Sequence, residues 1–92
     1  MEIVLEGIDI SNEYDVYFEL WKQEPEFGPY FGFNIHALWD YIGLLEGDSI
    51  VWNNSELSRD RLGDDFYKII SLFNDWNKNI STEDKKIKLY LR

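Results

Sequence analysis

Three short runs of strand-forming residues, widely separated along the chain, constrain the fold more than any other feature. The runs are Glu2–Gly7, Ser49–Trp52 and Lys86–Leu91. The segments between them carry helical patterns, and strands joined by helical crossovers are normally parallel. The sequence therefore predicts an α/β fold: a small three-stranded parallel sheet packed with about three to four helices, in a single domain over residues 1–92.

Capping and stopping residues mark two helices in the first half of the chain. Ser11 is the expected N-cap of the first helix, because a hydroxyl can accept a hydrogen bond from a free N–H of the first turn. Pro25 ends that helix, and Asn34 is expected to cap a second helix of about three turns. Aromatic, Gly and Pro residues fill the segment between the two helices, which predicts a loop.

The second half of the chain predicts one long helix. A polar stretch from residue 53 to 61 is consistent with a single helical turn that starts at Ser55. The longest helix follows, from Gly63 to about Asn77. Its predicted buried face consists of Phe66, Ile69, Ile70, Phe73 and Trp76. Its polar face carries Lys68, Ser71 and Asp75, with Leu72 at the edge.

The chain is strongly acidic, and its charge is unevenly distributed. The formal net charge is −9, yet residues 78–92 carry five basic and two acidic side chains, so the preceding 77 residues carry −12. Such a field repels nucleic acid and anionic membranes and attracts basic partners, although solubility alone is the simpler explanation. We expect no direct binding to nucleic acid and no association with a membrane.

Composition also bears on the compartment. The chain has no cysteine, which fits a reducing environment. Its N-terminal residues lack the basic and apolar regions of a signal peptide, and no stretch approaches the roughly 20 apolar residues of a membrane span. We expect a cytoplasmic protein that is monomeric when free.

Signals for an enzyme are poor. The chain has one histidine, His36, and no phosphate-binding loop, since the residues after Gly32 lack the required Lys-Ser/Thr pair. The adjacent acids at 64–65 and 83–84 are typical of solvated helix starts. We therefore expect a binding protein without catalytic residues, cofactor or metal ion.

The segment from residue 29 to 40 is the best candidate for a binding surface. His36 and Asp40 are one helical turn apart, and Gly43 completes the same exposed arc. For Trp39, on the shoulder of the helix, the pattern favours core packing over a surface role. The preceding loop carries more aromatic rings than one short loop can bury: Phe27, Tyr30, Phe31 and Phe33. An apolar patch beside an acid is typical of a protein-binding hot spot.

The run Tyr-Phe-Gly-Phe-Asn at residues 30–34, followed by Ala-Leu-Trp-Asp at 37–40, resembles the signature of the barstar family, small inhibitors of barnase-type ribonucleases. The resemblance covers most of the chain, with strands and helices in the family's order. It implies a three-stranded parallel sheet and a loop and second helix that occlude the ribonuclease active site.

The resemblance also implies roles for individual residues. Asp40 matches the central acid of the family's interface, and Tyr30 matches a loop aromatic that packs on the enzyme. Asn34 matches the Asn that starts the helix. Asp75 matches a position where the family often has a glutamate facing the enzyme. His36 departs from the pattern, since the best-known members have a second acid there.

The resulting hypothesis is a protein inhibitor of a ribonuclease, specifically a bacterial immunity protein or antitoxin that binds a basic toxin nuclease one to one. The expected partner-binding residues are Tyr30, Phe31, Phe33, Asn34, His36, Trp39, Asp40, Gly43 and Asp75. An acidic nucleic-acid mimic is the alternative, although His36 and Gly43 would interrupt its rows of acids. A carboxylate-based hydrolase is a third class. The identity of the target stays open.

Overall fold

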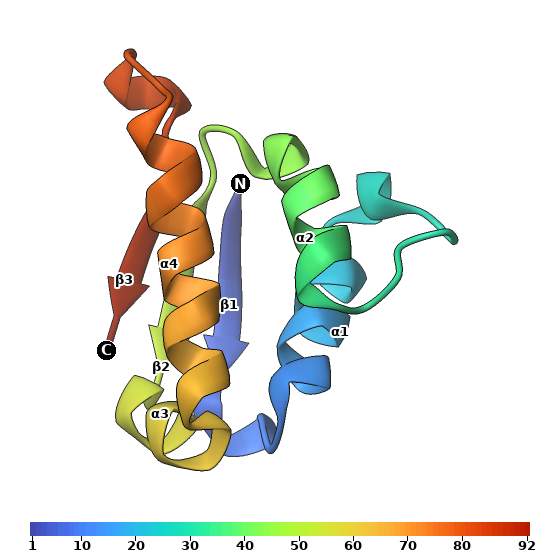
Figure 1. The fold of residues 1–92 in the computed structure, drawn as a ribbon, viewed down its shortest axis with the longest axis vertical. Coiled ribbons are helices and arrows are strands. Elements are labelled where there is room, and N and C mark those ends of the chain that lie inside the picture. The colour runs from blue at the N-terminus through green and yellow to red at the C-terminus, as the bar shows by residue number, and fades with distance from the viewer.

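The computed structural model describes residues 1–92 and contains the expected three-stranded sheet (Figure 1). The strands are β1 (Glu2–Glu6), β2 (Ser49–Asn53) and β3 (Lys88–Leu91), in the order β1-β2-β3. Both pairs are parallel, with Leu5 opposite Trp52 and Trp52 opposite Leu91. The predicted parallel α/β fold is confirmed, and β1 and β3 are the edge strands of the sheet.

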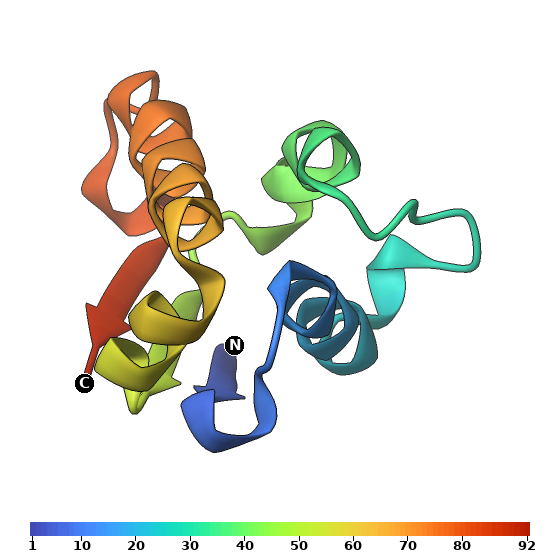
Figure 2. The same cartoon turned by 60° about the horizontal axis from the view of Figure 1, so that its bottom comes forward.

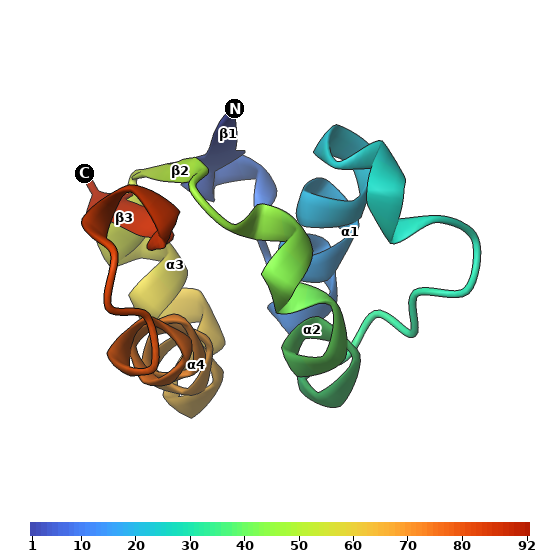
Figure 3. The same ribbon diagram turned by 90° about the horizontal axis from the view of Figure 1, so that it is seen from above.

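Four α-helices connect the strands. They are α1 (Glu13–Gln23), α2 (Ile35–Tyr41), α3 (Ser55–Leu62) and α4 (Asp64–Lys78). Four short 3-10 turns complete the chain: η1 (Gly7–Asp9), η2 (Pro25–Phe27), η3 (Ile42–Leu45) and η4 (Glu83–Lys85). Seen from above, the helices gather on one side of the sheet (Figure 3). None of the helices has the length and apolar composition that a membrane span requires.

The alternation of side chains along the strands explains this one-sided arrangement. In β1, Ile3 and Leu5 are buried under the helices, whereas Glu2 and Glu6 are exposed. In β2, Trp52 is fully buried and its Nε1 donates to Ser58 Oγ at 2.9 Å. This bond satisfies the indole N–H inside an apolar core of 19 residues.

The start of one helix and the length of another differ from expectation. Asn12, not Ser11, caps α1, since Asn12 Oδ1 accepts from Asp15 N at 3.2 Å. The Ser11 N–H is instead bound by Asp15 Oδ2 at 2.8 Å. In the second half, α3 is a helix of eight residues rather than a single turn. Because the side chains of this helix are mostly polar, its sequence does not indicate a buried face. In the structure, Ser58 lies on the buried face and accepts the hydrogen bond from Trp52.

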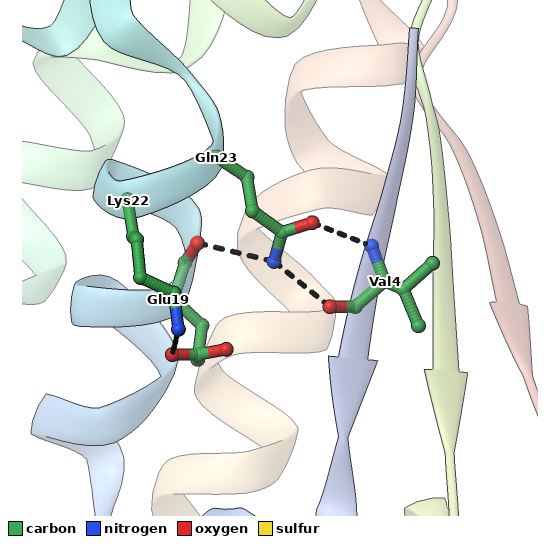
Figure 4. Close-up of polar contacts among 4 residues, drawn as sticks. All are labelled: Val4, Glu19, Lys22 and Gln23. Carbon is green, nitrogen blue, oxygen red and sulfur yellow. Dashed lines mark hydrogen bonds and ion pairs between the residues drawn. The ribbon is translucent and has the colours of Figure 1, made fainter.

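A glutamine side chain fastens α1 to the edge of the sheet (Figure 4). Gln23 Oε1 accepts from Val4 N at 3.0 Å, and Gln23 Nε2 donates to Val4 O at 2.8 Å. In a parallel sheet, the N–H and C=O of one residue point to the same side, so the amide group replaces a neighbouring strand at this residue. The same contact fixes the end of α1, where the loop to α2 begins.

We predict that Gln23→Leu lowers the free energy of unfolding by about 1–2 kcal/mol, because both hydrogen bonds to Val4 are lost while the apolar stem remains. Urea denaturation measures the change, and faster hydrogen exchange at the Val4 amide localises it. Lys22→Leu, at the exposed neighbouring position, is the control. Equal stability of Gln23→Leu and the control would contradict the role of the amide.

Candidate functional site

The loop between α1 and α2 projects from the body of the molecule (Figure 2). It is nevertheless anchored at several points. Trp21 Nε1 donates to Gly28 O at 2.8 Å. Phe27 and Phe31 are each 3% exposed, with ring centroids 4.8 Å apart, and Tyr41 closes the cluster at 5.5 Å from Phe31. The loop is therefore held by an aromatic cluster of its own.

Burial separates the loop aromatics into interior and surface rings. Tyr30 is 89% exposed, whereas Phe31 is 3% exposed. The expectation that Phe31 contacts a partner conflicts with this burial, because a ring in the core offers no surface; Phe31 instead supports the loop from beneath. Phe33 is half-buried and stacks 5.3 Å from Tyr14. Its backbone is left-handed, with φ of 53°, so its side chain turns back toward α1.

Asn34 caps α2, as the sequence predicts. Its Oδ1 accepts from Ala37 N at 2.8 Å, and its Nδ2 donates to Gly32 O at 3.1 Å. One side chain thus begins the helix and closes the turn before it. These bonds set the direction in which α2 leaves the loop.

The outer arc of α2 and η3 carries His36, Asp40 and Gly43, and all three residues are exposed. No side-chain hydrogen bond or ion pair within the chain engages Asp40. A Cβ added at Gly43 would meet no atom within 4 Å, so packing does not require glycine there. Asp40 is therefore a free carboxylate on an open surface.

The expectation that Trp39 packs in the core is wrong. Its side chain is 46% exposed, because it lies where α2 faces α4 across an open groove. The two helices lie side by side (Figure 1), and the groove between them has a volume of about 550 Å³. From α2 it is lined by Ile35, His36 and Trp39. From α4 it is lined by Tyr67, Lys68, Ser71, Leu72 and Asp75.

The groove brings together only some of the expected site residues. His36, Trp39 and Asp75 line it, whereas Tyr30, Asp40 and Gly43 lie outside it. The sequence does not indicate the α4 residues Tyr67 and Lys68 as site residues. The sequence did place Lys68 on the polar face of α4, but nothing in the pattern of one helix shows which other helix it faces.

Nowhere in the chain do three or more His, Cys, Asp or Glu side chains form a cluster that could hold a metal ion. The arrangement is instead suited to contact with another molecule. It combines exposed aromatic rings, a free carboxylate and a groove beside them.

A family model described as barstar (barnase inhibitor) matches residues 1–92, the whole length of the chain. The chain belongs to the barstar family. No curated protein matches the sequence. Membership of the barstar family implies an inhibitor of a barnase-type ribonuclease rather than an enzyme.

We predict that Asn34→Ala lowers the free energy of unfolding of this barstar-family protein by about 1 kcal/mol, because α2 loses its N-cap. Urea denaturation measures the loss. Asn34→Asp is the matched control, since a carboxylate can still accept from the Ala37 N–H. If both variants were equally destabilised, the cap bond would not be the cause.

Proposed function

We propose that this protein binds a ribonuclease one to one and occludes its active site, acting in the cytoplasm as the immunity protein or antitoxin of a bacterial toxin nuclease. The family match over the whole chain carries the proposal. The free carboxylate of Asp40 beside the exposed ring of Trp39 supports it, because this pair offers charge and apolar area on one helix.

The charge of the chain favours such a partner. A ribonuclease active site is built to hold phosphates, so it presents cationic groups that the carboxylate of Asp40 can meet. Charge pairs that become desolvated in an interface can couple by about 1.5–7 kcal/mol. The proposed contact surface consists of Tyr30, His36, Trp39, Asp40, Gly43 and Asp75, with Phe33 at its border and the exposed cap residue Asn34 at the start of α2.

The first test is inhibition of RNA cleavage by barnase and other basic ribonucleases of its type, followed by binding measurements on each enzyme that is inhibited. We predict that Asp40→Ala weakens binding by about 2 kcal/mol or more, roughly 30-fold. Asp9→Ala, at an exposed acid in η1, is the control with the same change in charge. A loss below about 1 kcal/mol would remove Asp40 from its central role.

The rate of association gives a second test. Because the chain carries a net charge of −9, we predict that association with a basic ribonuclease slows steeply as the salt concentration rises. Stopped-flow fluorescence measures the rate. An association rate that is indifferent to ionic strength would contradict electrostatic steering.

The same variants separate this function from that of a nucleic-acid mimic. A mimic distributes its binding energy over many acids, so that each substitution has a small and similar effect. An inhibitor of the proposed kind has one dominant position at Asp40. Inhibition of unrelated nucleic-acid-binding proteins, with no dominant residue, would favour the mimic.

A further inference from the structure

We propose that the groove between α2 and α4 accepts an acidic side chain of the partner, so that this surface takes a cation at Asp40 and an anion a short distance away. The identity of the partner as a ribonuclease rests on the proposed function. The preference of the groove for an anion rests only on its own side chains.

The walls of the groove are apolar. Ile35 and Trp39 line it from α2, and Tyr67 and Leu72 line it from α4. Trp39 is 46% and Tyr67 is 56% exposed, so both rings retain free surface for contact. A partner side chain that enters this groove is therefore expected to carry its polar group on an apolar stem.

The polar groups of the groove are mostly hydrogen-bond donors without a partner. His36, Lys68 and Ser71 line the groove, and none of their side chains makes a hydrogen bond or ion pair within the chain. The ammonium group of Lys68 carries a full positive charge, and the imidazole and hydroxyl groups can each donate.

Asp75 is the one carboxylate of the groove, and it has a cation beside it. Asp75 Oδ1 lies 3.4 Å from Lys78 Nζ, one turn further along α4. This exposed ion pair is weak, but it places a second cation beside the only acid of the groove. Lys78 offsets part of the charge of Asp75, whereas Lys68 has no ion-pair partner within the chain and presents its full charge to a guest.

Local and overall charge therefore disagree. The net charge of −9 favours a cationic partner for the molecule as a whole, whereas the groove itself offers a cation and donors. Asp40 lies outside the groove on the outer arc of α2, so the two opposite preferences do not cancel. A partner that presented only basic groups would leave Lys68 facing a like charge, and such repulsion is a source of specificity.

The test uses two small probes of matched shape, phenylacetate and benzylammonium, with benzyl alcohol as the neutral probe. Each is titrated into the labelled full chain at constant ionic strength, and amide shifts are followed by NMR. We expect phenylacetate to shift the groove amides of Ile35, Trp39 and Lys68, with an affinity about fivefold higher than that of benzylammonium. The overall charge alone predicts the opposite order.

Variants assign the preference to the groove. We expect Lys68→Glu to reverse the order of the two probes and Lys68→Gln to abolish the difference between phenylacetate and benzyl alcohol. Lys85→Glu changes the net charge by the same amount at an exposed residue outside the groove, and we expect it to leave the order unchanged.

Three results would overturn the proposal: equal or tighter binding of benzylammonium in the groove, shifts that map outside it, or the same response from Lys68→Glu and Lys85→Glu. None of these results bears on whether a ribonuclease is inhibited. Conversely, a failure to inhibit any ribonuclease would reject the proposed function and leave the measured probe preference in place.

Discussion

The helices cover only one face of the sheet, and this constraint shapes the rest of the molecule. Three strands spaced by about 4.8 Å span roughly 10 Å between the outer strands, which is close to the diameter of a single helix. The helices therefore share a face that is too narrow for all of them. Trp52, near the end of the central strand β2, anchors α3 through Ser58, and its ring lies 5.1 Å from that of Phe66 in α4. On the other side, Gln23 ties α1 to the edge of β1.

The groove is a consequence of this crowding. α4 covers β2 and β3, and α1 lies beside β1. α2 lies farther from the strands, next to α1 (Figure 3). Leu38 anchors α2 to the core with no exposed surface, but the flank that carries Trp39 finds no helix close enough to cover it. The exposed tryptophan is therefore explained by the arrangement of helices around a narrow sheet. Its apolar ring remains available for a partner.

Features that depend on one helix or strand could be predicted from the sequence, whereas those that depend on how two helices meet could not. Local signals are sufficient where the interactions are local: the sequence predicts Asn34 as a cap, and helical spacing predicts His36 and Asp40 on an exposed arc. The pattern predicts Trp39 in the core because periodicity reports only on which side of its own helix a residue lies. The groove was missed because it depends on two helices, about 30 residues apart, meeting at a particular angle. The parallel sheet was predictable, since helical crossovers leave few other topologies.

The order already present in the loop affects how strongly it can bind. Immobilising a flexible side chain on binding costs about 0.5–1.5 kcal/mol, and ordering the backbone costs more. Here Phe27 and Phe31 are packed in the core, Trp21 holds Gly28 O at 2.8 Å, and Asn34 fixes the start of α2. Most of that entropy is therefore lost on folding rather than on binding. Tyr30, at 89% exposure, is the ring that still has to be ordered. Asp40 extends from a helix whose start is already fixed by its cap. Its charge can therefore act on an approaching partner before the side chain of Tyr30 becomes ordered.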